Sequence, residues 1–135
     1  MKILIIEDND GARTLFKLAL SGHGYECLSA SDGRQGFDLL NSGKFDLVIT
    51  DLKMPGMDGV KLLELAKTAQ PDLQFIVVSG YLNDNLREEI KQFGNVYEIL
   101  TKPLKTLTLI ESVNEYFIFN GPIRTALPNR HPQSA

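Results

Sequence analysis

The sequence predicts an α/β fold, in which a doubly wound parallel sheet of five strands is flanked by five helices. Three observations predict it: short apolar runs recur five times, helical patterns lie between them, and two central runs, LVIT and FIVV, are apolar throughout. Strands that are apolar on both faces need cover on both sides, and strict alternation of strand and helix gives that cover to a parallel sheet. A chain of 135 residues fits one such domain.

The five apolar runs are the expected strands. Each run is too brief for a globular helix, and several are rich in isoleucine and valine, which favour strands. The expected strands are Lys2–Ile6, Tyr25–Ala30, Asp46–Thr50, Gln74–Val78 and Val96–Leu100.

The segments between the runs carry helical spacing and helix-end signals. Apolar residues recur at positions i, i+3, i+4 and i+7 in Ala12, Leu15, Phe16 and Ala19. Side-chain oxygens that can cap helix N-termini come from Asp10, Asp32, Asp58 and Asn83 or Asp84. Glycines that suit helix C-termini follow three of the helices, at Gly22, Gly43 and Gly94. The last helix is expected from about Pro103, a residue that fits a first turn, to about Phe119.

Composition excludes several classes of protein. A net charge of −3 and a pI near 5.3 argue against non-specific binding to nucleic acid, which needs a concentrated basic surface. No apolar run is long enough to cross a bilayer, and the ILII run after Lys2 is too short for a secretory signal, so we expect a cytoplasmic protein. A single cysteine, Cys27, rules out an internal disulfide.

The residues at the ends of the expected strands are polar. They are Glu7 and Asp8 after the first strand, Asp51 after the third, Ser79 after the fourth and Lys102 after the fifth. Each has an ordinary structural explanation when taken alone, such as a helix cap, a turn residue or a solvated charge. In open parallel sheets, however, ligands bind beyond the carboxyl ends of the strands, so these side chains are expected to share one shallow pocket.

That pocket predicts phosphoryl transfer with a divalent cation. Three close carboxylates repel one another, and Mg²⁺ is the hard cation that suits oxygen ligands combined with a phosphate oxygen. A carboxylate, Mg²⁺, a lysine and a hydroxyl together fit a phosphoryl-transfer site in which Asp51 is the nucleophile and forms an acyl phosphate. In the loop that follows, Pro55 stiffens the turn, and Gly56 and Gly59 permit backbone shapes that leave the carboxylate open.

Four segments, ILIIEDND, FDLVITDLKMPGMDG, IVVSG and LTKPL, resemble the four signatures of the receiver domain of bacterial two-component response regulators. The resemblance spans about Met1 to Phe119. It implies a flavodoxin-like fold with strand order 2-1-3-4-5, as in single-domain regulators of the chemotaxis type. Residues 1–119 would be the receiver domain. Residues 120–135, which contain three prolines and no apolar periodicity, would be a flexible tail or the start of a linker.

The resemblance also implies the donor of the phosphoryl group, its acceptor and the ligands of the cation. Asp51 would accept it from the phosphohistidine of a sensor histidine kinase or of a histidine phosphotransfer protein. The implied Mg²⁺ ligands are Asp8, Asp51 and the main-chain carbonyl of Lys53, with Glu7 acting through a metal-bound water. Such a chain is a phosphoacceptor that takes part in its own phosphorylation and dephosphorylation, and we do not expect an enzyme with turnover.

Further roles follow from the same resemblance. Lys102 would pair with the phosphoryl oxygens, and Ser79 would swing to donate a hydrogen bond to them. Gly80 is small and should leave the phosphoryl group accessible, and Lys102–Pro103 is expected to be a cis peptide bond. The active state would bind an unknown downstream protein through the fourth helix, fifth strand and fifth helix.

One position departs from the family pattern. Receiver domains usually carry an aromatic residue three positions before the conserved lysine, where this chain has Ile99. Tyr97 precedes it by two residues and is therefore expected on the same strand face, roughly 6 to 7 Å away. Whether Tyr97 substitutes for the missing aromatic residue is left open by the sequence. Near the last helix end lie Tyr116, Phe117 and Phe119. Such aromatics are more often core or cover residues than partner contacts, but an exposed pair would mark a homodimer surface, and the sequence leaves both interpretations open.

Three alternatives compete with this interpretation. In a haloacid-dehalogenase-like phosphohydrolase, the DNDG segment that starts at Asp8 would carry the nucleophile, but Asp51 and its loop would have no role. A flavodoxin-like flavin module needs a first loop rich in Ser, Thr and Gly, whereas this loop is acidic. An adaptor that is never phosphorylated would not need the complete set of polar residues at the strand ends.

Overall fold

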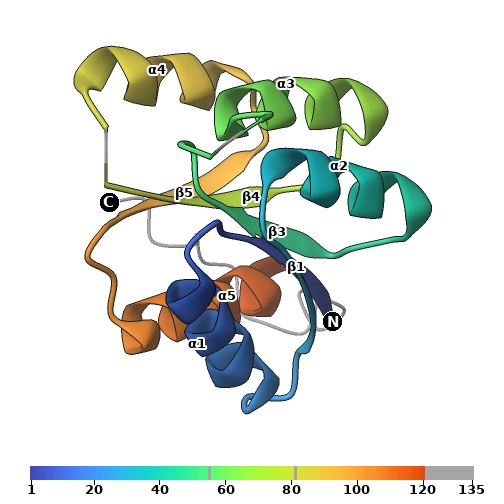
Figure 1. The fold of residues 1–135 in the computed structure, drawn as a ribbon, viewed down its shortest axis with the longest axis vertical. Coiled ribbons are helices and arrows are strands. Elements are labelled where there is room, and N and C mark those ends of the chain that lie inside the picture. Colours follow the sequence, from blue (N-terminus) through green and yellow to red (C-terminus); the bar gives the residue numbers. More distant parts are fainter. Residues whose placement is uncertain (55, 81, 121–135) are drawn as a thin grey trace.

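The computed structural model describes residues 1–54, 56–80 and 82–120, so the predicted roles of Pro55 and of the segment after Asn120 lie outside the described residues. Five strands and five helices alternate along these described residues (Figure 1). The strands are β1 (Lys2–Ile6), β2 (Glu26–Ala30), β3 (Leu47–Thr50), β4 (Phe75–Ser79) and β5 (Val96–Thr101). The helices are α1 (Asp10–Ser21), α2 (Gly33–Ser42), α3 (Gly59–Ala69), α4 (Asp84–Gln92) and α5 (Thr106–Asn120).

The sheet confirms the predicted fold class and strand order. All four strand pairs are parallel, and the order across the sheet is β2-β1-β3-β4-β5. Every residue of the central strands β3 and β4 is buried, as the uninterrupted apolar runs predict. Each strand end agrees with its prediction to within one residue.

Helices cover both faces of the sheet (Figure 1). Alternate residues of β1 enter separate cores: Ile3 and Ile5 pack in the core beneath α1 and α5, whereas Leu4 and Ile6 pack in the core beneath α2, α3 and α4. The period of two along the strand therefore produces two cores, one on each face. Tyr116 and Phe117 belong to the first of these cores, so the structure does not place them on an exposed dimer surface.

The helix caps agree with prediction at three positions and differ at one. Asn9, rather than Asp10, caps α1, because its backbone is extended and its side-chain oxygen accepts from the Ala12 N–H at 2.8 Å. Asp10 is already the first helical residue. The other side-chain caps are Asp32 for α2, Asp58 for α3 and Asn83 for α4.

The start of α5 also differs from the prediction. The Lys102–Pro103 peptide bond is cis, as the family resemblance implies. The helix begins at Thr106 instead of Pro103, and the Leu109 N–H donates to the Lys105 carbonyl in its first turn. At the other end α5 includes Asn120, which was expected to start the tail.

A register shift in β5 corrects the expected position of Tyr97. Phe75 of β4 pairs with Val96, but the next residue, Ile76, pairs with Glu98, so Tyr97 is one extra residue in β5. Such a bulge breaks the simple alternation of side chains along a strand. Tyr97 consequently packs in the core beneath α1 and α5, whereas Ile99 packs in the core on the opposite face. The two side chains do not share a face.

Gly59 joins α3 to the loop that follows β3. Its N–H donates to the Leu52 carbonyl at 2.8 Å, and a Cβ added to it would lie 2.2 Å from the Asp51 carbonyl oxygen and 2.6 Å from the Leu52 Cα. Gly56 has a φ of +78°, the left-handed shape that the sequence predicts, whereas Gly59 is needed because backbones approach closely.

We therefore expect Gly59→Ala to lower the free energy of unfolding by about 3 kcal/mol, because backbone atoms cannot yield to the added methyl group as a flexible side chain can. Guanidinium unfolding monitored by circular dichroism measures this change. Gly43→Ala is the matched control, since nothing lies closer than 3.8 Å to its added Cβ. Equal stability of the two variants would contradict the packing argument.

Candidate functional site

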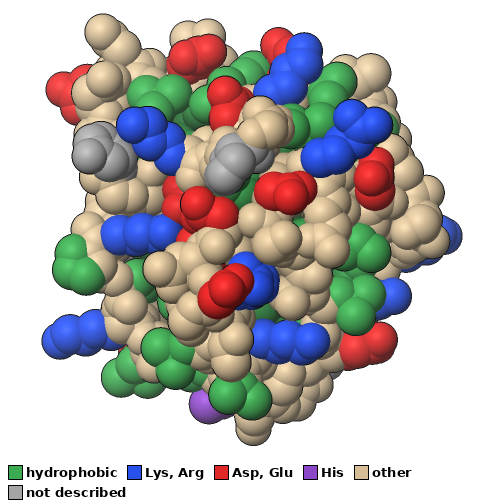
Figure 2. All heavy atoms as spheres, viewed as in Figure 1, with side chains coloured by type: hydrophobic (Ala, Val, Ile, Leu, Met, Phe, Trp, Pro, Cys, Tyr) green, Lys and Arg blue, Asp and Glu red, His purple; other side chains and the backbone are tan. Residues whose placement is uncertain are grey.

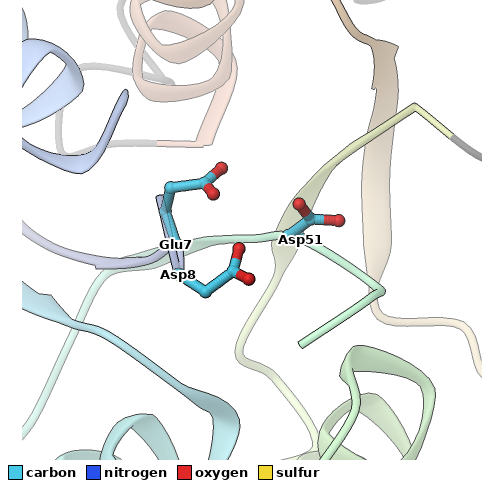
Figure 3. A group of neighbouring side chains, drawn as sticks. All are labelled: Glu7, Asp8 and Asp51. Atoms are coloured by element: carbon cyan, nitrogen blue, oxygen red, sulfur yellow. The ribbon is translucent and has the colours of Figure 1, made fainter. Parts of the chain in front are cut away.

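Three carboxylates meet at the carboxyl ends of β1 and β3. One oxygen from each of Glu7, Asp8 and Asp51 lies within 4.8 Å of the others. Figure 3 shows the Glu7 and Asp8 side chains turned toward the side on which Asp51 lies. Glu7 and Asp51 are only 2% and 6% exposed, whereas Asp8 is exposed. The structure therefore brings together the three carboxylates that were predicted from the strand ends.

Strand register explains why the acidic residues meet. Ile6 of β1 lies beside Thr50 of β3, so the next residue of each strand leaves the sheet at the same level. The Asp51 N–H donates to the Ile6 carbonyl at 3.2 Å and the Glu7 N–H to the Ala30 carbonyl at 3.1 Å, which continues both ladders by one bond. The backbone of the two buried acids is therefore held by the sheet itself.

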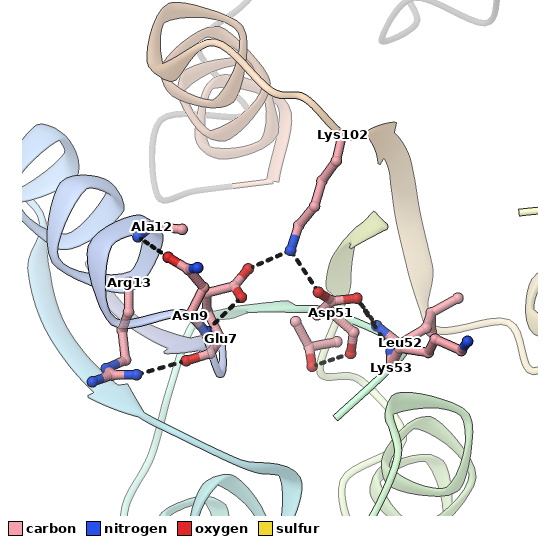
Figure 4. A network of polar contacts seen from close by, with 9 residues as sticks. Glu7, Asn9, Ala12, Arg13, Asp51, Leu52, Lys53 and Lys102 are labelled. Atoms are coloured by element: carbon pink, nitrogen blue, oxygen red, sulfur yellow. Dashed lines mark hydrogen bonds and ion pairs between the residues drawn. The ribbon is translucent and has the colours of Figure 1, made fainter. Parts of the chain in front are cut away.

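Lys102 reaches the two buried carboxylates from the loop after β5 (Figure 4). Its Nζ lies 2.6 Å from Asp51 Oδ2 and 2.9 Å from Glu7 Oε1. Burial by itself lowers the pKa of the Lys102 ammonium, but hydrogen bonds and charge attraction from Asp51 and Glu7 outweigh burial and raise the pKa above the usual lysine value. One ammonium thus contacts two of the three carboxylates, which leaves a net negative site.

The second oxygen of Asp51 is held by the loop that follows it. Asp51 Oδ1 accepts the N–H groups of Leu52, at 2.6 Å, and of Lys53, at 3.2 Å. The carboxylate therefore has a fixed orientation, with Oδ1 toward the loop amides and Oδ2 toward Lys102. Charge-assisted bonds of this kind are stronger than bonds between neutral groups.

Ser79 ends the strand that lies between these groups, and Gly80 follows it. Ser79 is the last residue of β4, rather than the residue after it, and is 1% exposed. Because β4 lies between β3 and β5, Ser79 lies between the strands that carry Asp51 and Lys102. Its carbonyl accepts the Lys102 N–H at 3.0 Å, and a Cβ on Gly80 would contact the Lys102 side chain at 3.7 Å.

Arg13 is a residue of the site that sequence reasoning missed. Its guanidinium donates to the Glu7 main-chain carbonyl at 2.9 Å (Figure 4). It also donates to the Asp10 carboxylate at 2.5 Å. The only signal in the sequence is an arginine six residues after the first acid, one turn into the following helix. That signal is weak, because one of the two acceptors of Arg13 is a main-chain carbonyl, and every residue has one.

The donor set fits a small divalent cation. Carboxylate oxygens are the ligands that Mg²⁺ prefers, and oxygens grouped this closely can bind one ion together. No hydrogen bond or ion pair with another described residue holds the Asp8 carboxylate, whereas both oxygens of Glu7 are engaged, one with Lys102 and the other with the Asn9 N–H. On the face in Figure 2, acidic side chains gather near the middle with lysines and arginines around them.

Comparison with known proteins shows the family. A family model described as the response regulator receiver domain matches residues 3–114. The chain belongs to the receiver domain family. It is 30% identical over 115 residues to sporulation initiation phosphotransferase F of Bacillus subtilis (strain 168), which covers 85% of this chain and 92% of that protein. Several longer relatives, among them sensor kinases and transcriptional regulators, are covered over only 12% to 30% of their length.

Solved structures of receiver domains share the fold. A CheY-like receiver domain protein from Methanospirillum hungatei JF-1 superposes with a TM-score of 0.81 at 28% identity, covering 84% of this chain and 90% of that one. The response regulator TrrA from Thermotoga maritima, in complex with Mg(2+)-BeF, superposes with a TM-score of 0.74 at 28% identity, covering 84% and 96%. Two-component phosphotransfer signalling is therefore the function class of this receiver domain.

No finding favours the haloacid-dehalogenase-like alternative. Asp10, the second acid of the DNDG segment, is the first residue of α1, and its 88% exposed side chain pairs with Arg13.

Within residues 1–54, 56–80 and 82–120, no helix is long and apolar enough to cross a membrane.

Lys102 should contribute to the stability of the receiver domain at neutral pH. We expect Lys102→Met to lower the free energy of unfolding by about 2 kcal/mol at pH 7, because two buried carboxylates lose their partner. The loss is smaller than for a fully buried ion pair because Lys102 is partly solvated. Urea unfolding measures the loss, with Lys61→Met as control, since that lysine forms an exposed pair with Glu64 on α3.

The sign of the pH dependence follows from the raised pKa of Lys102. A lysine whose pKa is raised in the native state stabilises the fold fully below its unfolded pKa of about 10.4, and the contribution is lost as the pH rises through the native value. The difference in free energy of unfolding between wild type and Lys102→Met should therefore stay constant from pH 7 to about 10 and become smaller above that pH. A difference that grows at alkaline pH would contradict this assignment.

Proposed function

We propose that Asp51 is the phosphoacceptor of this receiver domain and receives a phosphoryl group from the phosphohistidine of a sensor histidine kinase or a histidine phosphotransfer protein. One observation carries the proposal: the buried Asp51 carboxylate lies 2.6 Å from Lys102 Nζ and within 4.8 Å of two further carboxylates. A nucleophile, a cation and metal-binding oxygens at one point are the components that phosphoryl transfer requires.

The transfer forms one bond and breaks another. A carboxylate oxygen of Asp51 attacks the phosphorus, the P–N bond to the histidine breaks, and the imidazole nitrogen keeps the electron pair and later takes up a proton. Loop amides hold Asp51 Oδ1, so the carboxylate does not have to reorient during attack. Lys102 then pairs with the new phosphoryl oxygens, and the Ser79 hydroxyl donates to another of them.

Residues of this chain would hold the cation. Asp8, Asp51 and the main-chain carbonyl of Lys53 are the proposed direct ligands, and Glu7 acts through a water. Bound Mg²⁺ supplies neutralisation of the charge on the transferring group. The acidic group fits this role, because three carboxylates and one ammonium leave two negative charges, which one Mg²⁺ ion balances.

Activation would be a shift between two pre-existing conformations, driven only by the difference in how well each conformation holds the phosphoryl group. We place that difference at Ser79 and the segment after it. The active state would bind a downstream protein through α4, β5 and α5. We further propose that residues 1–119 act as the receiver domain in the cytoplasm, without direct contact to nucleic acid, and that the following segment is a tail or linker.

Phosphorylation from a small donor tests the assignment of Asp51. Wild-type protein incubated with phosphoramidate and Mg²⁺ should gain one PO₃ unit by intact mass, and Asp51→Asn should gain none, because the attacking carboxylate oxygen is replaced by an amide. Omission of Mg²⁺ in the presence of chelator should abolish the gain. Asp46→Asn, at the other end of β3, is the control and should behave as wild type.

Two outcomes would overturn the proposal. An equal gain of mass in wild type and Asp51→Asn would place the modified residue elsewhere. A gain that survives Asp51→Asn but disappears in Asp8→Asn would instead support the haloacid-dehalogenase-like alternative, in which Asp8 is the nucleophile.

A further inference from the structure

Arg13 connects two parts of the loop that carries the first acids. One end of its guanidinium, Nη1, donates to the Glu7 carbonyl at 2.9 Å, and the other, Nη2, donates to the Asp10 carboxylate at 2.5 Å. Figure 4 shows the Arg13 side chain reaching from α1 back to the end of β1. The side chain is only 20% exposed, although it lies in the first turn of a surface helix.

The two bonds differ in what they accomplish. The partner in the second bond, Asp10, is 88% exposed, and an exposed i,i+3 ion pair contributes little to stability. The first bond reaches the carbonyl of the peptide that joins Glu7 to Asp8. That peptide is the last one before Asp8, so its orientation fixes the direction in which the Asp8 side chain leaves the backbone.

Asp8 depends on this bond more than its neighbours do. The Glu7 carboxylate is held by Lys102 and the Asn9 N–H, and Asn9 is held by its own capping bond to Ala12. Among the described residues no hydrogen bond or ion pair holds the carboxylate of Asp8, which is exposed. The position of Asp8 is therefore set by its backbone alone.

We propose that Arg13 is a positioning residue for the cation site: its fork fixes the Glu7–Asp8 peptide and thereby holds Asp8 ready to bind a divalent cation. This inference rests on the proposed function, in which Asp8 is a metal ligand. A lysine cannot replace the arginine, because its single ammonium is attracted to the Asp10 carboxylate and lacks the second, separately directed N–H group that Arg13 donates to the Glu7 carbonyl.

Charge alone predicts the opposite effect, which makes the proposal testable. A guanidinium near a cation site repels the cation, so its removal would strengthen cation binding if Arg13 acted only through its charge. If Arg13 acts by positioning, removal of the fork weakens binding even though a positive charge is lost. The direction of the change in affinity therefore separates the two roles.

The experiment measures the binding of Mn²⁺ to unphosphorylated protein by electron paramagnetic resonance. Mg²⁺ is then added as a competitor. We expect Arg13→Lys and Arg13→Gln each to weaken Mn²⁺ binding by about tenfold or more, the range for loss of a group that orients a metal ligand. Asp10→Asn keeps the bond to Glu7 and should change affinity by no more than about twofold, as fits loss of an exposed pair. Arg34→Gln, on α2 and paired with Asp38, is the matched arginine control.

Thermal unfolding without cation shows whether each variant is folded at the temperature of the titration, and Arg13→Lys remains a test if Arg13→Gln is not. Unchanged affinity in Arg13→Lys, or tighter binding in Arg13→Gln, would overturn the inference while leaving the proposed function intact. Failure of the wild-type protein to bind Mn²⁺ would overturn the cation site itself and this inference with it.

Discussion

The structure depends on one constraint: two buried carboxylates and an exposed one must stay close together without forcing the sheet apart. Glu7 and Asp51 follow neighbouring parallel strands at the same level, so they cannot separate while the β1–β3 ladder is intact. Lys102 approaches from beyond β4 and joins both acids through one ammonium. The strand order 2-1-3-4-5 is what brings these three loops to one point.

The site divides into a fixed half and an open half. Asp51 is held by two loop amides and by Lys102, and the loop behind it is pressed against α3 at Gly59, where no side chain would fit. Asp8 is exposed and its carboxylate has no such bonds within the described part of the chain. A rigid Asp51 carboxylate beside an Asp8 carboxylate that remains available suits the proposed site, which would accept both a cation and a phosphoryl group.

Sequence alone predicted the features that depend on composition and on strand ends. Five apolar runs gave the strands, and polar residues after them gave the acids and the lysine, because parallel topology forces those positions together. Prediction from the sequence failed for features that depend on contacts the sequence pattern does not encode. The extra residue at Tyr97 exists only relative to β4, and the role of Arg13 depends on a backbone carbonyl that no side-chain pattern reveals. Asn9 and Asp10 are equally good caps by type, and only the local backbone separates them.

The bulge in β5 limits how phosphorylation can be communicated. Tyr97 lies on the α5 side, where its hydroxyl donates to Glu115 at 3.1 Å and its ring meets Tyr116 edge to face at 4.9 Å. Ile99 occupies the position at which receiver domains usually carry an aromatic residue. To substitute for that residue, Tyr97 would have to leave the core beneath α1 and α5 and cross to the other face of the sheet. Each lost contact opposes such a movement. In the proposed function, a change of state is therefore carried by groups that touch the phosphoryl group directly. Both central strands end in a hydroxyl residue, Thr50 in β3 and Ser79 in β4. The Thr50 hydroxyl already donates to the Asp51 main-chain carbonyl at 2.9 Å, so Ser79 is the proposed carrier.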